Sequence, residues 1–428
     1  MHRVLSVSVV APVATVALLG IAGSRTTAWA QAPTDPREQA RSHVGPFYVT
    51  PTLKLQEAGV DTNVFNTATS EKADFTATLV PHADVWVPLG QRGLLTLSGT
   101  LPLVYYQTYA SERAVNPDVA LRGDLRLNRI SFFTAATYSN SRSRPNLEID
   151  TRARHEQTGV EAGLSLQLAP RLSLDASAFQ TDVAFDEDAT FNSISLRDTL
   201  NRHTRAATTA LRYDVTPLTR VFVRGQLIED RFVFSPVRDA DSVAIMPGVE
   251  FQPRALISGS AAVGVRRFRP THPAVPDHTG VVVAANLSYA FRSTTRVRVT
   301  ATRDLAYSYS DAQPYYRIGG VGLLVSRHLG GRFDVTAGGD WETHRYRRRT
   351  IAVEPLPIAT PPMTPGPIVP LTATVNHLRM WSASVGYRFA RSQRLGLGAS
   401  YRERNSNSTE LNSQYSGFRF MATVDSEL

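Results

Sequence analysis

Apolar and polar residues alternate with a period of two along most of this chain, from about residue 47 to the end. In residues 95–103 every second position is Leu or Gly, and the positions between them are Thr, Ser or Pro. Residues 119–127 repeat the pattern, with Arg and Asp on the polar side. Neighbouring side chains of a strand point to opposite faces, so each segment has one face suited to hydrocarbon and one suited to water. The pattern predicts many amphipathic strands.

Short and long polar connections alternate between these segments. Eight short connections lie at residues 90–92, 128–129, 169–171, 216–219, 252–254, 292–295, 330–331 and 390–393. Nine long connections lie at residues 61–70, 110–117, 141–156, 185–203, 231–241, 270–277, 310–314, 345–374 and 404–413. Together they separate 18 strands, with 16 as the alternative count. An even strand number with short periplasmic turns and long extracellular loops is typical of bacterial outer-membrane barrels. We predict an all-β fold, a transmembrane antiparallel up-and-down β-barrel.

The predicted strands are long enough to cross a membrane. A tilted spanning strand needs roughly nine to eleven residues, and segments such as 75–89, 294–309 and 332–344 reach that length. Strands of soluble proteins average only about five or six residues. Aromatic residues near strand ends are expected to form girdles at the membrane interfaces. These are Tyr105, Tyr106, Tyr109, Tyr289, Phe291, Tyr307, Tyr309, Tyr315, Tyr316, Tyr387 and Phe389.

The first 30 residues have the features of an export signal. A basic start at Arg3 precedes a mostly apolar stretch over residues 4–22, and the small-x-small sequence Ala28-Trp29-Ala30 follows. We therefore expect a signal peptide at residues 1–30, a short periplasmic tether at residues 31–45 and a barrel at residues 46–428. This organisation predicts a protein of the bacterial outer membrane.

Composition and charge narrow the class of protein. The chain has no cysteine, which excludes disulfides and thiolate metal sites. Its formal charge is +9, and all basic side chains except Lys54 and Lys72 are arginines or histidines. No basic helix or recognition motif accompanies this charge, so we expect no nucleic-acid partner. We also expect no cofactor and no metal ion.

Charged residues that alternate with apolar ones are predicted to line the inside of the barrel. A barrel of about 18 strands encloses an aqueous channel unless loops fill it. Mixed charges with arginine in excess suit a wet lumen with a mild preference for anions, or a surface that hydrogen-bonds sugars. The predicted lumen residues are Arg122, Asp124, Arg126, Arg212, Asp214, Arg224, Arg296, Arg298, Asp304, Asp334, Asp340, Arg388 and Arg419.

The long connection at residues 345–374 has an unusual composition. Arg345, Arg347, Arg348 and Arg349 follow the end of a predicted strand. They are predicted to contact the phosphates of lipopolysaccharide, since guanidinium groups bind phosphate well. The alternative is that they form the base of a free loop and are solvated by water. The following segment, residues 352–371, is rich in proline and should be extended. It either narrows the pore or forms an outer flap.

Candidate catalytic and metal-binding residues are few. His82 and Asp84 lie two residues apart on one strand face, a spacing that suits an acid/base pair. Two solvated lumen groups are the favoured explanation, because no Ser or Asn partner is tied to the pair, and we expect no enzyme and no catalytic residue. The acidic run at residues 182–188 lacks the spacing of a calcium loop. A barrel-embedded hydrolase is therefore the less favoured alternative function.

The start of the mature chain resembles the putative β-barrel porin 2 family of outer-membrane proteins. The resemblance rests on Val49-Thr50-Pro51-Thr52-Leu53, on Gly59-Val60-Asp61-Thr62-Asn63-Val64-Phe65 and on Leu79-Val80-Pro81. It implies a barrel over the whole mature chain and, through the family's association with polysaccharide export machinery, passage of saccharides. The chain ends in Leu428 and not in the usual aromatic residue, although residues 418–424 form a last apolar face.

These observations predict a pore for the passive passage of hydrophilic solutes, with saccharide or exopolysaccharide export as the specific version. The expected partners are outer-membrane lipid and lipopolysaccharide, the barrel-insertion machinery and periplasmic polysaccharide-export components. A surface adhesin or receptor that acts through its long loops, above all residues 185–203 and 352–371, is the alternative.

Overall fold

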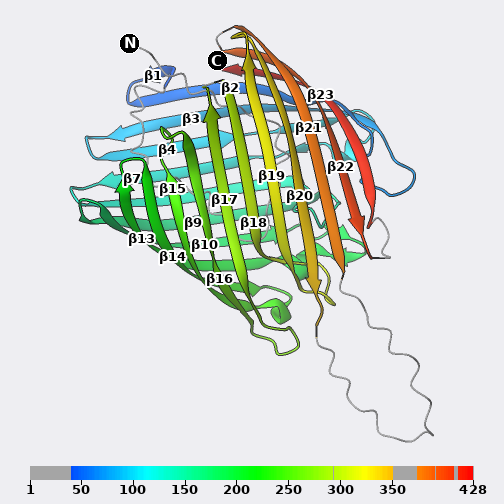
Figure 1. Cartoon of the computed structure of the whole chain (residues 1–428). Coiled ribbons are helices and arrows are strands. Elements are labelled where there is room, and N and C mark those ends of the chain that lie inside the picture. The colour runs from blue at the N-terminus through cyan, green and yellow to red at the C-terminus, as the bar shows by residue number, and fades with distance from the viewer. Residues whose placement is uncertain (1–39, 293, 350–373, 391, 409–412, 428) are drawn as a thin grey trace, which may run out of the picture.

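The computed structural model describes residues 40–292, 294–349, 374–390, 392–408 and 413–427. Most of them, 73%, belong to strands, and the strands pair antiparallel (Figure 1). The strands of the main sheet are β1 (Ser42–Val44), β2 (Phe47–Asp61), β3 (Asp74–Leu89), β4 (Gly93–Thr100), β5 (Leu103–Tyr106), β6 (Ala114–Val115), β7 (Asp118–Arg126), β8 (Ile130–Ser143), β9 (Ala153–Ala169), β10 (Leu172–Phe185), β13 (Arg202–Thr216), β14 (Thr219–Phe232), β15 (Ala240–Phe251), β16 (Ile257–Pro270), β17 (His278–Phe291), β18 (Thr295–Tyr307), β19 (Tyr315–Leu329), β20 (Phe333–Arg347), β21 (Val375–Ala390), β22 (Gln393–Ser406) and β23 (Tyr415–Glu427).

The sheet closes on itself. Each strand pairs with the next along the chain, and the last strand, β23, pairs with β2 through contacts such as Asp61↔Arg419. Two of the wall strands are interrupted, and each consists of two segments. β4 and β5 form one of them and both pair with β3. β7 and β6 form the next one, in which β7 pairs with β4 and β6 pairs with β5. Pro102 and Pro117 lie at these interruptions, where a residue without an N–H group cannot donate to the ladder. The result is a closed barrel of 18 strands, which confirms the predicted fold class and excludes the count of 16.

Short turns lie at one end of the barrel and long loops at the other. The eight turns between β3–β4, β7–β8, β9–β10, β13–β14, β15–β16, β17–β18, β19–β20 and β21–β22 have two to five residues each. The nine connections at the opposite end have 7 to 27 residues. Both ends of the described chain lie on the turn side (Figure 1). We call the two sides the turn end and the loop end.

The outer face of the barrel is apolar. On β14, for example, Val221, Val223 and Leu227 are exposed, and the residues between them are buried or half-buried. The same alternation runs around the ring, so a band of exposed apolar side chains faces outward in the way that a hydrocarbon solvent requires. In the part of the chain that is described, no helix is long and apolar enough to span a membrane.

Smaller elements lie outside the barrel wall. β1 pairs with β2 at the turn end, so residues 42–44 of the expected tether extend the sheet. The expected signal peptide and residues 31–39 of the tether lie outside the described residues. At the loop end are two short 3-10 helices, η1 (Ala110–Glu112) and η2 (Pro236–Arg238), the strand pair β11 (Thr190–Phe191) and β12 (Ile194–Ser195), and the helix α2 (Leu196–Leu200).

One hairpin departs from the wall at the loop end. β17 pairs with β18 only from Val283↔Arg303 to Phe291↔Thr295, whereas β18 and β19 stay paired as far as Tyr307↔Tyr315. Beyond Arg303 this hairpin leaves β17 and packs against Phe268, which lies on the inner face of β16. The β18–β19 hairpin therefore enters the barrel instead of extending its wall.

Candidate functional site

The ladder registers show which side chains face the inside of the barrel. On β13, Leu211, Tyr213 and Val215 are exposed on the outer face, and Arg212 and Asp214 point the other way. Directly paired residues of neighbouring strands share a face, so this alternation can be followed around the ring. It places the other predicted lumen residues on the inner face as well, namely Arg122, Asp124, Arg126, Arg224, Arg296, Arg298, Asp304, Asp334, Asp340, Arg388 and Arg419. Their role in solute passage stays a prediction.

Many inner-face charges are paired, often with residues that the sequence did not single out. The pairs include Arg122–Asp124 (2.8 Å), Arg220–Asp214 (2.5 Å), Arg394–Asp334 (2.9 Å from Nε) and Arg212–Asp175. Such pairing keeps the wall hydrophilic while reducing its net field. The partners Asp175, Arg220 and Arg394 were missed because they lie on other strands that only the register brings together. Asp175 and Arg220 are one strand away from their partners, and Arg394 on β22 is two strands away from Asp334 on β20.

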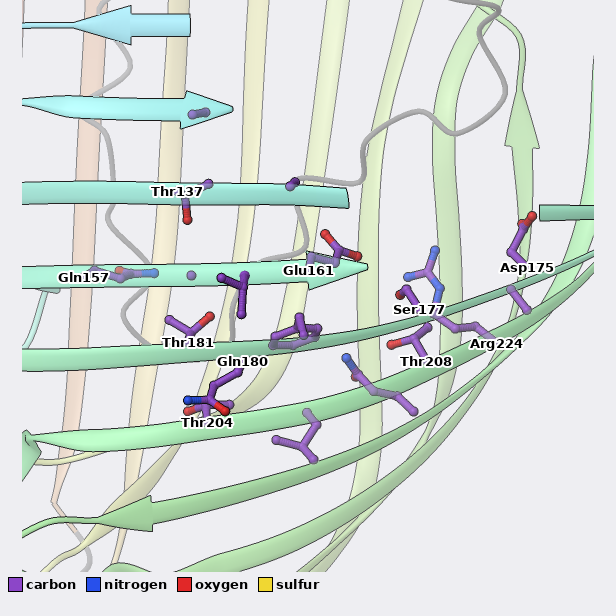
Figure 2. Close-up of a pocket in the computed structure, with 18 of the residues that line it drawn as sticks. Thr137, Gln157, Glu161, Asp175, Ser177, Gln180, Thr181, Thr204, Thr208 and Arg224 are labelled. Carbon is purple, nitrogen blue, oxygen red and sulfur yellow. The ribbon is translucent and has the colours of Figure 1, made fainter. Parts of the chain in front are cut away.

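A cavity of about 710 Å³ lies inside the barrel along β7 to β18. Five arginines and five carboxylates line it: Arg122, Arg202, Arg212, Arg224, Arg266, Asp118, Glu161, Asp175, Asp230 and Glu250. Figure 2 shows side chains from neighbouring strands in this space, with Glu161, Ser177, Thr208 and Arg224 close to one another. The balance of charges differs from the expected arginine excess. This part of the lumen suits a neutral polar solute better than an anion.

Hydroxyl, amide and aromatic groups complete the cavity. Thr137, Gln157, Thr181 and Thr204 supply donors and acceptors on successive strands (Figure 2). Phe179 adds an aromatic ring on the inner face of β10. A few polar groups among aromatic surfaces are characteristic of small-molecule sites. The arrangement can bind a solute rich in hydroxyl groups.

The loop end of the barrel is filled by its own loops. Glu148, Ile149, Val64 and Asn66 belong to loops and are almost completely buried. Arg238, in η2, is also buried and donates to Asp311 Oδ1 at 2.7 Å and to the carbonyl of Tyr309 at 3.1 Å. Loop residues of an open barrel mouth would face water. We refer to this filled region as the mouth.

A β-bulge on β2 directs Asp61 into the mouth. The pairing register of β2 shifts between residues 55 and 59, where Glu57 has a positive φ of 53°. A bulge of this kind reverses the face on which the following residues lie. Gly59 follows it, and a Cβ there would overlap the carbonyl of Phe420, so this position requires glycine. The bulge turns Asp61 inward, opposite Arg419.

Asp61 is the acceptor for two partly buried arginines. Its carboxylate lies 2.8 Å from Arg419 Nε and 3.1 Å from Arg402 Nη2, and only 1% of the residue is exposed. It also accepts a hydrogen bond from the backbone N–H of Asn63 at 3.0 Å. The side-chain amide of Asn63 donates to the carbonyl of Ser416 at 2.8 Å. The Asp61-x-Asn63 sequence thus joins β2 to β22 and β23 where the barrel closes.

The next residue of the same motif holds a neighbouring loop. The carbonyl of Val64 accepts from Arg144 Nη2 at 2.7 Å and from Arg152 Nη1 at 3.1 Å. Both arginines flank the β8–β9 loop, and burial together with the nearby positive charge of Arg152 lowers the pKa of the Arg144 guanidinium to about 9. The β2–β3 loop therefore holds the β8–β9 loop against the closing strands.

Glu148 and Asp150 of the β8–β9 loop extend these contacts across the barrel. Asp150 accepts from Arg404 of β22 and, at 2.9 Å, from Asn66 of the β2–β3 loop. Glu148 Oε1 accepts from Ser308 Oγ at 2.5 Å, and Ser308 belongs to the β18–β19 loop. Six strands separate β9 from β18 on one side of the ring, namely β10, β13, β14, β15, β16 and β17. The bond between Glu148 and Ser308 thus spans the mouth.

Apolar side chains pack beneath these polar contacts. Ile149 contacts a cluster from β9, β10, helix α2 and the β18–β19 loop, which comprises Ala153, Val183, Phe185, Ala189, Leu196, Leu200 and Tyr309. A second cluster joins Tyr315 to Phe268 and Leu305. Burial of this much apolar surface favours the closed arrangement of the loops.

The structure corrects part of the predicted aromatic girdles. Tyr106, Tyr309, Tyr315 and Tyr316 are at most 7% exposed and lie inside the barrel or the mouth, so their assignment to the girdles was wrong. Tyr105, Tyr289, Phe291 and Phe389 are exposed on the outer face, as predicted. The incorrect residues lie mostly on the β18–β19 hairpin, which enters the barrel.

His82 and Asp84 form a contact on the inner face of β3. His82 Nε2 lies 3.1 Å from Asp84 Oδ2, and its Nδ1 lies 2.9 Å from Thr100 Oγ1. The three side chains satisfy one another as a partly exposed polar cluster. In the described residues, no three histidine or carboxylate side chains gather into a potential metal site.

The four arginines predicted to contact lipopolysaccharide occupy different places. Arg345 and Arg347 are exposed on the outer face at the end of β20, and Arg348 is exposed just after it. The backbone N–H of Arg349 donates to the carbonyl of Ala312 at 3.0 Å, which places this residue against the β18–β19 loop. The proline-rich segment 352–371 lies outside the described residues.

The buried charge of Asp61 leads to a stability prediction. Asp61→Ala should lower the free energy of unfolding by about 3–5 kcal/mol, because it leaves the partly buried Arg402 and Arg419 guanidinium groups without their shared carboxylate. Asp241→Ala is the matched control, since its partner Arg231 is 41% exposed and such surface pairs contribute about 0–1 kcal/mol. Urea unfolding of both variants in lipid vesicles, followed by tryptophan fluorescence, measures the difference. Equal stability of the two variants would contradict the role given to Asp61.

Comparisons with known proteins give one family match and several remote structural similarities. The family model described as "Putative beta-barrel porin 2" matches residues 35–428. The chain is similar to the crystal structure of a BenF-like porin from Pseudomonas fluorescens, at 12% identity and a TM-score of 0.49, covering 90% of this chain and 100% of that one. It is similar to the outer membrane protein opdK of Pseudomonas aeruginosa, at 10% identity and a TM-score of 0.47. The match covers 89% of this chain and 98% of opdK. It is also similar to the siderophore receptor PirA of Pseudomonas aeruginosa, at 7% identity and a TM-score of 0.43. The match covers 89% of this chain and 80% of PirA. No curated protein matches the sequence.

Proposed function

This chain belongs to the Putative beta-barrel porin 2 family, and from that premise we propose that it is an outer-membrane β-barrel through which hydrophilic solutes pass passively. The observation that carries the proposal is the wall itself, which is apolar outside and lined inside by charged, hydroxyl and amide groups around a cavity of about 710 Å³. A polar interior of this kind is typical of barrels that conduct solutes. The turn end faces the periplasm in this proposal, and the loop end faces outward.

Saccharides are the proposed solute class. The cavity has equal numbers of arginines and carboxylates, many hydroxyl and amide groups, and aromatic rings such as that of Phe179. Sugars match such a surface because they are neutral, rich in hydroxyl groups and flat on one face. Export of an exopolysaccharide, delivered by periplasmic export components, is the specific form of this proposal.

The mouth implies that passage requires movement of loops. The bond between Glu148 and Ser308 joins loops on nearly opposite sides of the ring. We therefore propose a pore of low resting conductance whose loop end opens for its solute. The same contacts disfavour a surface adhesin, because the buried mouth loops contact one another. We propose no reaction for the His82–Asp84 cluster.

Saccharide binding in the cavity can be tested by channel block. Maltohexaose added at the turn side should reduce the current through the open barrel. Phe179→Ala should weaken this block about two- to tenfold, because the variant loses one aromatic contact with the sugar. Phe132→Ala is the matched control, because Phe132 is exposed on the outer face of β8. Equal block in the wild type and both variants would remove Phe179 from the proposed sugar site.

A further inference from the structure

Four arginines form a patch on the outer face at the loop end. They are Arg303 of β18, Arg317 of β19 and both Arg345 and Arg347 of β20. Arg317 lies directly opposite Arg345 in the ladder, and Arg303 pairs with Gly319, two residues from Arg317. The alternation places this arginine patch on the outer face shared by Val299, Val321 and Leu323.

The arginine patch lacks counter-charges from the protein. Among the residues that the structure describes, no carboxylate forms an ion pair with any of its four members, and Arg317 lies in the electrostatic field of the other three. Like charges directly opposite each other on paired strands are destabilising. Elsewhere on the outer face, Arg231 is neutralised by Asp241 at 2.7 Å. An arrangement that repels itself is stabilised when an external anion binds.

The patch also adjoins an open strand edge. Pairing between β17 and β18 ends at Val283↔Arg303, so residues 278–282 of β17 have no ladder partner on that side among the described residues. His278, at the start of this edge, lies within electrostatic range of Arg303, Arg317 and Arg347. Unpaired edges of an antiparallel ladder expose backbone N–H groups. The guanidinium groups therefore lie beside further hydrogen-bond donors.

The position of the patch identifies the kind of anion. Val299, Val321 and Leu323 are 44–56% exposed on the same strands, just on the membrane side of the arginines. Basic groups at the border of an apolar surface bind anionic lipid headgroups, and the guanidinium fork matches phosphate oxygens. We propose that the arginine patch binds a phosphate of an outer-leaflet glycolipid whose acyl chains lie along this apolar face.

This set of residues revises the one predicted from the run of arginines in the sequence. Arg345 and Arg347 remain in it. Arg303 and Arg317 enter through the pairing of β18, β19 and β20, whereas Arg349 contacts the β18–β19 loop instead.

Native mass spectrometry of the full barrel in neutral detergent tests the proposal. Titration with diphosphoryl lipid A should show a saturable bound lipid, and the double variant Arg317→Gln/Arg345→Gln should weaken its binding about tenfold or more, since two charge-assisted contacts are removed. Monophosphoryl lipid A should bind the wild type more weakly than the diphosphoryl form. Arg231→Gln is the matched control, and it should bind as the wild type does, because Arg231 already has a carboxylate partner.

Two results would overturn the proposal. Binding of diphosphoryl lipid A that is equal in the wild type and the double variant, with both shown to be folded by circular dichroism, would exclude the patch as its site. Displacement of the lipid by millimolar inorganic phosphate alone would show a site for free anions and not for a glycolipid. Restoration of binding by Arg317→Lys/Arg345→Lys, relative to the glutamine pair, would support recognition through charge.

Discussion

Replacing Glu148 and Asp150 together by alanine should raise the single-channel conductance of this barrel severalfold. The two carboxylates connect the β8–β9 loop to Arg404 on β22 and to Ser308 across the mouth. Removal of Asp150 leaves the buried Arg404 guanidinium without its carboxylate partner, at a cost of about 3–5 kcal/mol that the loop avoids by moving out of the mouth. A barrel of 18 strands is wide enough to hold an aqueous channel once its loops are displaced.

The chain offers a matched control for this double variant. Asp186 and Asp188 belong to the neighbouring β10–β13 segment, and both are exposed. Asp186→Ala/Asp188→Ala removes the same charge from the same end of the barrel. Planar-bilayer recordings of the two double variants should show larger current steps only for the change at residues 148 and 150. A conductance increase of the same size in the control would mean that charge, and not the release of the mouth, governs the current.

Conductance should also rise with pH between about pH 5 and pH 7.5. Burial raises the pKa of the Glu148 carboxyl to about 7, against the opposing effects of the Ser308 hydroxyl and the Arg404 guanidinium. Because this pKa in the closed mouth lies above the ordinary value of 4.5, the closed arrangement is most stable below pH 4.5. The stability of the closed arrangement relative to the open one falls by up to about 3 kcal/mol as the pH rises through 7.

The surroundings of Glu148 explain this direction. Among the described residues no donor lies within hydrogen-bonding distance of its Oε2 atom, so burial disfavours the charged carboxylate there. Tyr316 and Tyr346 face it from β19 and β20, and Arg238 adds a positive charge from η2. Glu148→Gln is neutral at every pH and keeps an acceptor for Ser308. It should give a low conductance without this pH dependence, as measured by bilayer recordings at pH 5, 6, 7 and 8. A pH response of unchanged size in this variant would rule out Glu148 as its source.

The barrel could be predicted from the sequence because its determinants are local. The period-two alternation fixes which face of each strand meets lipid, and the lengths of the connections fix the strand count. All eight short turns and nine long loops lie where the sequence places them, within a few residues. The inner-face positions of residues such as Arg212 and Asp334 follow from the same alternation.

The mouth could not be predicted, because its determinants are distant in the sequence. Asp61 and Arg419 are 358 residues apart, and they meet only because β23 closes on β2 and a bulge at Glu57 reverses the face of Asp61. The motif around Asp61 and Asn63 signalled a family resemblance but not this contact. The tyrosines of the β18–β19 hairpin were misassigned for a related reason. An aromatic residue near a strand end has the same local pattern whether it meets lipid or packs inside the barrel. Here the departure of β18 from β17 directs these tyrosines to the inside.

Single-channel recording of the purified wild-type barrel in a planar bilayer tests whether hydrophilic solutes pass through this lumen. Passage of hydrophilic solutes through a polar lumen with a loop-filled mouth predicts small, discrete, ohmic current steps that become larger in the Glu148→Ala/Asp150→Ala variant. A wild type and a variant that are both folded and inserted, yet both silent, would contradict the account, since the barrel would then enclose no continuous aqueous path.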